Sequence, residues 1–122
     1  MLNLSHSQLR CLLTVYELEG ENDPIASKEI AVQMHVSRPS VHRLLEGLIG
    51  RGLIRKEPYG DVFLSEKGRE AARELSVLRT RGGRAFRRCF AMEGEEADRA
   101  VLYLLSGVDR DTAEKIAAAG EE

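Results

Sequence analysis

The stretch VSRPSVHRLLEGLIGRGLI, residues 36–54, constrains the fold most, because it has the pattern of one capped amphipathic helix. Its apolar residues recur at helical spacing, so they form a single stripe on one face. The stripe consists of Val41, Leu44, Leu45, Leu48 and Ile49. Ser37 is suited to cap the N-terminus, and Pro39 is tolerated in the first turn. Gly50 and Gly52 then end the helix.

Two helical patterns precede this stretch. Residues 5–19 contain neither Gly nor Pro and predict a first helix, and residues 27–34 predict a short second helix with Ser27 as its N-cap. Only residues 35–37 separate the second helix from the third. A short helix, a tight turn and a longer capped helix are typical of a helix-turn-helix, whose second member lies in the major groove of DNA.

The pattern changes after the third helix. Residues 53–57 and 62–64 predict two strands joined by a turn, which together form the two-stranded wing of a winged helix. Ser65 is suited to cap a long helix that runs to about residue 92, with a kink or break at Gly82 and Gly83. Two further helices follow, at about 94–106 and 109–119. The predicted fold is mainly α with a small β-wing, a DNA-binding domain over 1–65 and a helical dimerisation region over 66–122.

Charge is unevenly distributed along the 122 residues, whose net charge is −2. Residues 1–92 carry +4 and residues 93–122 carry −6, which favours a protein that meets a polyanion with one end. Residues 79–88 hold five arginines and no acid; they are either solvated or paired with the acidic tail across a dimer, or they contact DNA backbone. We expect a cytoplasmic protein with no membrane partner, since no signal peptide and no apolar run of about 18 residues is present.

Most of the chain resembles the first two domains of the DtxR/MntR-type metalloregulators, with the MarR-type regulators second. The similarity is carried by KEIAVQMHVSRPSVHRLLEGLIGRGLI, by PYGDVFLSEKGREAA and by FAMEGEEADRAVLYLLSGVDRDTAEKI. It implies a homodimeric winged-helix regulator of transcription. It also implies metal-binding acids and histidines, but the matching positions here hold unsuitable side chains, namely Arg10, Leu13, Arg79, Arg99, Leu102 and Tyr103. Arginine and leucine do not ligate a divalent ion, so we expect no metal and no other cofactor.

Other chemistry is weakly indicated. The three histidines fall in different predicted elements without metal-binding spacing, and no nucleotide-binding loop or catalytic triad is present, so no enzyme activity is predicted. The two cysteines, Cys11 and Cys89, are far apart and do not form a disulfide framework. Both are interpreted as small apolar residues, although Cys89 lies beside Arg87 and Arg88, which would suit a thiol sensor.

We therefore predict a regulator that binds double-stranded DNA as a homodimer on a pseudo-palindromic site. The residues expected to face the major groove are Ser37, Arg38, Pro39, Ser40, His42 and Arg43, and those expected to contact backbone are Lys28, Lys56 and Tyr59. Two alternatives stay open. One is a winged-helix module that binds protein and not DNA, and the other is a DtxR-like regulator that senses an unidentified small non-metal effector near Arg10, Arg79 and Arg99.

Overall fold

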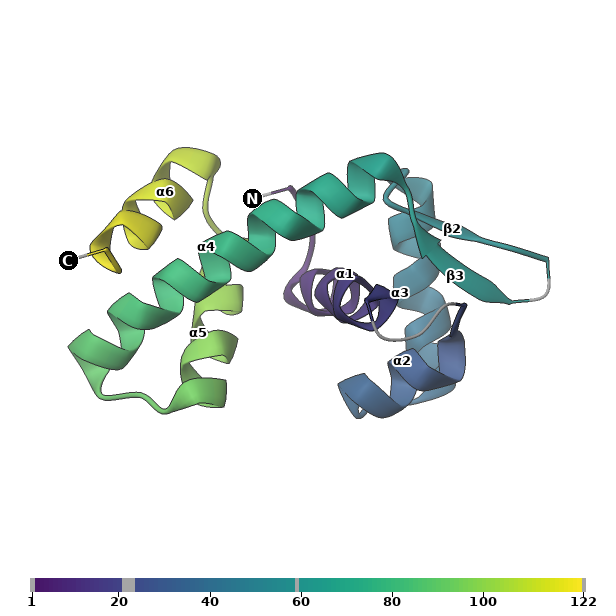
Figure 1. Ribbon diagram of the computed structural model, residues 1–122, viewed down its shortest axis with the longest axis horizontal. Coiled ribbons are helices and arrows are strands. Elements are labelled where there is room, and N and C mark those ends of the chain that lie inside the picture. Colours follow the sequence, from purple (N-terminus) through teal and green to yellow (C-terminus); the bar gives the residue numbers. More distant parts are fainter. Residues whose placement is uncertain (1, 21–23, 59, 122) are drawn as a thin grey trace. The chain divides into compact units, whose positions relative to one another are not determined.

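A computed structural model describes residues 2–20, 24–58 and 60–121. The elements in these residues are α1 (His6–Glu19), β1 (Ile25–Ala26), α2 (Ser27–Met34), α3 (Arg38–Gly50), β2 (Ile54–Lys56), β3 (Asp61–Leu64), α4 (Glu66–Phe90), α5 (Gly94–Ser106) and α6 (Arg110–Ala119) (Figure 1). They pack as two units: the winged unit, Ser7–Arg73, and the helical unit, Met1–His6 with Glu74–Glu122. The predicted fold class, mainly α with a small β-wing, is confirmed. No helix of the described residues combines the length and the low polarity needed to cross a bilayer.

The core of the winged unit is the surface where α1, α2 and α3 meet. The apolar residues at helical spacing are buried, and they include Leu9, Leu12, Leu13, Ile30, Met34, Val41, Leu45 and Leu48. The apolar stripe of α3 is narrower than the sequence predicts, because Leu44 is only half-buried and Ile49 is 39% exposed. Helix α3 ends with Gly52 in the left-handed region (φ +74°), and the Leu53 N–H donates to the Leu48 carbonyl at 3.0 Å.

The turn between α2 and α3 is tight and well bonded. His35 adopts a left-handed conformation (φ 58°), which lets the Val36 N–H donate to the Ala31 carbonyl at 3.1 Å. The Arg10 guanidinium of α1 donates to the Met34 carbonyl at 2.8 Å and so satisfies the end of α2. These bonds fix the start of α3 relative to α1 and α2.

The predicted N-cap of α2 is wrong by one residue. Ala26 holds the N-cap position, and Ser27 is the first residue of the helix and is buried. Glu29 supplies the polar contact, because its carboxylate accepts from the Ala26 N–H at 3.3 Å. The backbone of Ala26 is extended because this residue also belongs to a strand.

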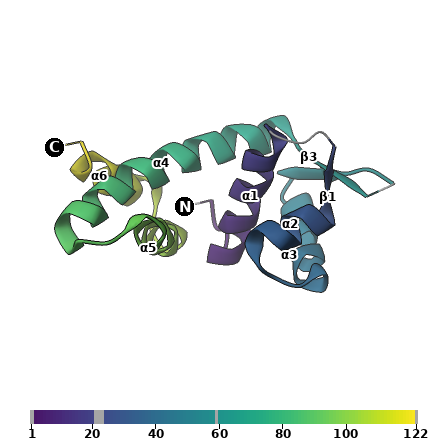
Figure 2. The ribbon, with the colours of Figure 1, turned by 60° about the horizontal axis from the view of Figure 1, so that its bottom comes forward.

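That strand was not predicted, and it makes the wing three-stranded. Strands β2 and β3 pair antiparallel with Arg55 opposite Phe63, while β1 pairs antiparallel with β3 and places Ile25 opposite Val62. The strand order is β1-β3-β2, as Figure 2 shows for β1 beside β3. The third strand covers one edge of the hairpin, which would be only marginally stable alone.

The first turn of α4 is held against the start of the wing. The Ser65 hydroxyl oxygen accepts from the Gly68 N–H at 2.9 Å, which confirms the predicted cap, and the hydroxyl donates to the Gly52 carbonyl at 2.6 Å. A Cβ at Gly68 would lie 1.8 Å from the carbonyl oxygen of Leu53. The close approach therefore requires glycine at position 68.

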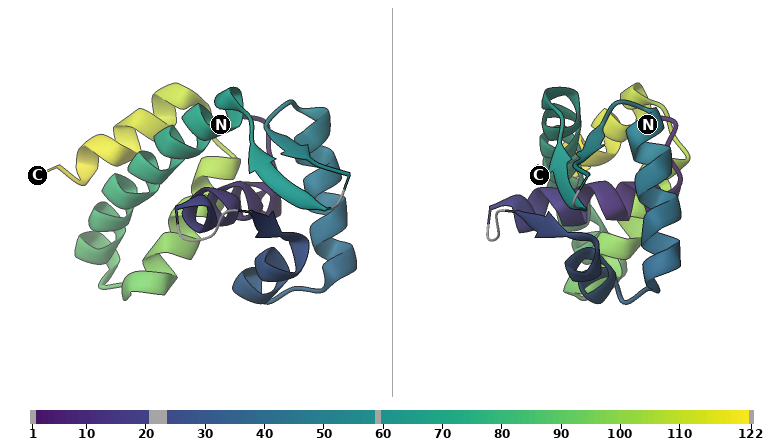
Figure 3. Two further views of the ribbon diagram at one scale, coloured as in Figure 1. Left: turned by 45° about the vertical axis from the view of Figure 1, so that its right-hand side comes forward. Right: turned by 90° about the vertical axis from the view of Figure 1, so that its right-hand side faces the viewer.

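The helical unit consists mainly of the second part of α4 with α5 and α6 (Figure 3). A kink or break is predicted at Gly82 and Gly83, and the break is wrong, since α4 is continuous over 25 residues. A Cβ at Gly82 would lie 3.1 Å from Val101 and 3.4 Å from Ile116, so the glycine allows α5 and α6 to approach α4 closely. The packing of α4 against α5 and α6 compensates for the low helix propensity of Gly82.

The arginine run of α4 is largely engaged within the same chain. Arg81 pairs with Glu121 at 2.5 Å, and Arg87 pairs with Asp98 at 3.5 Å. The Arg88 guanidinium donates to the Ala119 carbonyl at the end of α6. The acidic tail thus neutralises part of this run inside one chain.

The Gly68→Ala substitution should lower the free energy of unfolding by roughly 3 kcal/mol, because a backbone carbonyl occupies the position of the added methyl group. Urea unfolding followed by circular dichroism measures this value. Gly50→Ala is the matched control, since no atom lies within 4 Å of its Cβ position, and it should leave stability unchanged or raise it by up to about 1 kcal/mol. Equal stability of the two variants would contradict the close approach at Gly68.

Candidate nucleic-acid interface

The N-terminal half of α3 brings most of the predicted DNA-facing residues together on the surface. Arg38, Pro39, His42 and Arg43 are exposed, while Ser40 is half-buried. Arg38 and His42 are four residues apart, as are Pro39 and Arg43, so neighbouring side chains share one face of the helix. The position of this face follows from the burial of Val41 and Leu45 on the other side.

Two serines hold the start of α3. The Ser37 Oγ accepts from the Ser40 N–H at 3.2 Å, which confirms the predicted cap. The Ser37 hydroxyl also donates to the Ser40 Oγ at 2.8 Å. The donor of Ser37 is therefore engaged, whereas the hydroxyl proton of Ser40 can still be offered to a ligand.

The wing adds a cation to this face of α3. Nζ of Lys56, the last residue of β2, lies 3.4 Å from Nδ1 of His42, and both side chains are exposed. Sequence reasoning named both residues but could not place them side by side. Arg55, the preceding residue, has its guanidinium carbon 5.7 Å from the centre of the Phe63 ring.

The remaining predicted backbone contacts are less well defined. Lys28 is exposed in the first turn of α2. Tyr59 lies outside the described residues.

The local charge of the interface differs from the charge of its unit. Residues 7–73 contain ten Lys and Arg and ten Asp and Glu, so the winged unit carries no net formal charge. Residues 37–56 contain five of these cations and only one acid, Glu46. Positive charge is therefore concentrated on the third helix and the adjoining strand.

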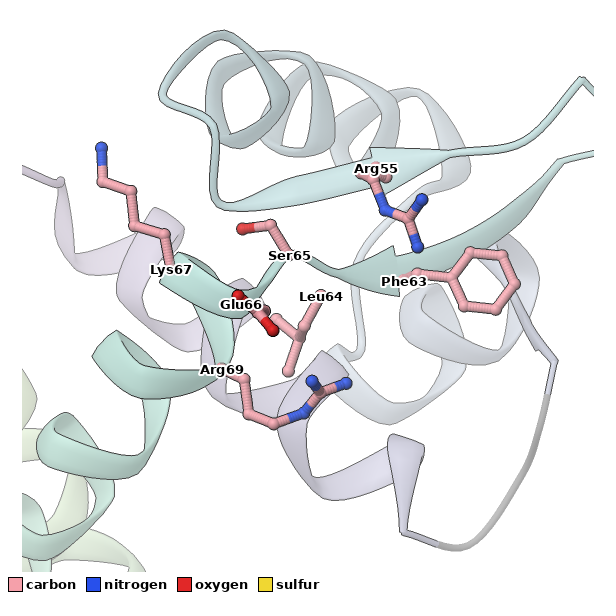
Figure 4. Close-up of a pocket in the computed structure, with 7 residues that line it drawn as sticks. All are labelled: Arg55, Phe63, Leu64, Ser65, Glu66, Lys67 and Arg69. Carbon is pink, nitrogen blue, oxygen red and sulfur yellow. The ribbon is translucent and has the colours of Figure 1, made fainter.

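A depression of about 600 Å³ lies near the start of α4, but most of its cations are already bound. Its lining residues are Arg55, Phe63, Leu64, Ser65, Glu66, Lys67 and Arg69 (Figure 4). Two nitrogens of Arg69 donate to Glu19 Oε1 at 2.9 and 2.5 Å. Lys67 points away from Arg55 and donates to the Arg51 carbonyl at 3.2 Å. These contacts leave Arg55 as the lining cation without such an anchor.

The residues at the positions that match metal ligands do not fit a metal. The described residues contain no group of three or more His, Cys, Asp or Glu side chains that could hold an ion. Arg10 is a cation, and its guanidinium is bonded to the Met34 carbonyl. Arg10 belongs to the winged unit, whereas Arg79 and Arg99 belong to the helical unit, so an effector site that involves all three stays a prediction.

The two cysteines differ in reactivity. Cys11 is buried in α1, and this burial raises the pKa of its thiol to about 12, although the nearby positive charge of Arg10 acts in the opposite direction. The thiolate is the nucleophile, so Cys11 is inert near neutral pH. Cys89 is exposed on α4, where a reagent can reach it.

Comparison with known proteins finds one matching family model and several solved structures with a similar fold. Residues 2–61, which include α1 to α3 and β2, match the model of the MarR family. The solved structure of T. acidophilum IdeR is similar with a TM-score of 0.71 and 18% identity, over 93% of this chain and 54% of that chain. No curated protein matches the sequence.

Two other solved structures share the fold. The hypothetical protein SSo2273 from Sulfolobus solfataricus matches with a TM-score of 0.67 and 17% identity, over 93% of this chain and 86% of that chain. The manganese-activated repressor ScaR, in its apo form, matches with a TM-score of 0.62 and 24% identity, over 90% of this chain and 51% of that chain. The chain thus spans about half the length of IdeR and of ScaR.

Proposed function

Because this chain is a winged helix-turn-helix protein similar to MarR-type and DtxR/MntR-type transcriptional regulators, we propose that it binds double-stranded DNA as a homodimer and does so without metal. One observation carries the proposal. The capped start of α3 presents Arg38, His42 and Arg43 to solvent, and Lys56 of the wing approaches the same face within 3.4 Å of His42. This is the placement that lets a recognition helix and its wing contact one duplex.

The side chains on α3 have the donors that major-groove recognition uses. Arg38 and Arg43 each offer a planar guanidinium, which suits the N7 and O6 acceptors of guanine. Ser40 can donate its hydroxyl proton, and Pro39 offers an apolar contact to a thymine methyl group. Lys28, Lys56 and Tyr59 have the chemistry for backbone phosphates. Base readout by α3 and backbone contact by the flanking residues together define the proposed site.

Homodimer formation is supported by apolar side chains that the helical unit leaves in water. Val77 is 49% exposed, Phe90 63% and Tyr103 58%. Phe90 also packs on Phe86, with ring centroids 5.4 Å apart. A second copy of the chain would cover such exposed side chains, and a twofold dimer would present two α3 helices to a pseudo-palindromic site.

Metal independence is supported by the contacts of Arg10. A bound cation is disfavoured beside a fixed guanidinium by Coulomb repulsion. The bond from Arg10 to the Met34 carbonyl already links α1 to the end of α2, so the helix-turn-helix is held without an added ion. The bond from Arg10 to the Met34 carbonyl therefore supports a regulator whose affinity for DNA does not change with metal concentration.

The first test is binding of the purified protein to its own upstream promoter DNA at two salt concentrations, with a chelator or with added Mn(II). We expect specific binding that weakens with salt and ignores both additions. Binding that requires Mn(II) would contradict metal independence. A complete lack of binding would favour the second candidate, a protein-binding winged helix, which the zero net charge of residues 7–73 supports.

The Arg43→Ala substitution should reduce discrimination between the preferred site and its single-base variants by about 1–3 kcal/mol, since a guanidinium–guanine pair would be lost. Selection from randomised duplexes measures this preference. Arg73→Ala, which removes the same charge from an exposed position of α4, should keep the base preference. An unchanged preference in both Arg43→Ala and Arg38→Ala would exclude base readout by these arginines.

The Phe90→Glu substitution should convert the dimer to a monomer at micromolar concentration, because a carboxylate would be buried in an apolar interface. Light scattering after size-exclusion chromatography measures the mass. Val32→Glu is the matched control, since Val32 is 72% exposed on α2 of the winged unit and should not alter the mass. A monomeric wild-type protein would rule out the dimer.

A further inference from the structure

The contact between Lys56 Nζ and His42 Nδ1 bears on which ring nitrogen of His42 carries the proton. A lysine ammonium has three donors and no acceptor. Its approach to Nδ1 at 3.4 Å is therefore a hydrogen bond only if Nδ1 is the acceptor. The neutral imidazole then carries its hydrogen on Nε2, so its remaining polar atom is a donor.

We propose that Lys56 is a positioning residue that fixes His42 as an Nε2–H donor, so that α3 selects guanine over cytosine on the strand that His42 contacts. This inference rests on the proposed DNA-binding function. Guanine presents two acceptors in the major groove, N7 and O6, whereas cytosine presents the N4 amino donor there. A histidine held as a donor accordingly favours guanine and rejects cytosine on the contacted strand.

The surroundings of His42 allow this role. The His42 side chain is exposed, so a ligand can reach Nε2. The charged neighbours one turn away on α3 are Arg38 and Glu46, and Lys56 is the charged group that β2 contributes. Figure 1 shows β2 beside α3, and Lys56 is the last residue of that strand.

One lysine can serve both parts of the interface. The donor that Lys56 gives to His42 leaves two others on the same ammonium for a backbone phosphate. A phosphate contact made by the wing would then hold the lysine in place, and the lysine would hold the imidazole. The phosphate contact of the wing and the base contact of α3 would then depend on each other through the His42–Lys56 contact.

Protonation of His42 would remove the coupling. An imidazolium has no lone pair on Nδ1, so both ring nitrogens donate and the contact with Lys56 is lost.

The first experiment uses the free protein and does not depend on DNA binding. Nitrogen-15 chemical shifts of the His42 ring, measured by NMR near pH 8, report the tautomer. We expect the Nε2–H form in the wild type, in Lys56→Arg and in Arg55→Met, and a mixture of tautomers in Lys56→Met. Arg55→Met is the matched control, because it removes the adjacent cation, whose guanidinium lies over Phe63. Identical shifts in Lys56→Met and the wild type would overturn the proposal.

The second experiment selects binding sites from randomised duplexes. Lys56→Met should lower the preference for guanine over cytosine by about 3- to 10-fold at the one base pair that His42→Ala also affects, whereas Lys56→Arg should keep this preference. Arg55→Met should weaken binding while keeping that preference. Uniform weakening by Lys56→Met with the preference intact would overturn the proposal and make Lys56 a phosphate contact alone. If the wild type binds no DNA, the proposed function fails and base selection by His42 fails with it, whereas the NMR result still decides the tautomer.

Discussion

Burial of Val41, Leu45 and Leu48 against α1 and α2 is the interaction on which the interface depends. A helix has one orientation about its axis, so once this stripe is inward the residues between its members must face solvent. His42 and Arg43 are exposed for that reason. The left-handed Gly52 then turns the chain into β2, which returns Lys56 to the exposed face of α3. The packing of α3 therefore places the proposed readout residues and the Lys56 ammonium together.

Local patterns explain why much of the fold could be predicted from the sequence. The α3 helix, its Ser37 cap and the Ser65 cap each depend on residues a few positions apart, and the structure confirms them. The errors arose where distant residues decide the outcome. Gly82 lies inside a helix because α5 and α6 need its small size, and β1 has only two residues and exists by pairing with β3. No local pattern contains that information.

The same distinction applies to the candidate site. The residues of α3 could be grouped from the sequence because a single helix fixes their relative positions. The His42–Lys56 contact spans 14 residues and depends on the turn at Gly52 and on strand register, so it could not be predicted. The sequence-based expectation about charge was less accurate. The +4 of residues 1–92 suggested a basic DNA-binding front, but residues 7–73 are neutral, and the excess lies in the arginine run of α4. Under the proposed function, affinity for DNA depends on where a few cations are placed, more than on total charge.

His35 has a consequence for how the sequence can vary. Its left-handed backbone costs most residues roughly 1–2 kcal/mol, while glycine adopts it freely and asparagine tolerates it. A β-branched side chain there would strain the backbone of the three-residue turn. Lengthening the turn would displace Val36 from the Ala31 carbonyl. Substitution at position 35 is thus confined to a few residue types, and the length of the turn is fixed. The neighbouring exposed positions of α3 are free to change, and under the proposed function such changes would alter the DNA sequence that the protein binds.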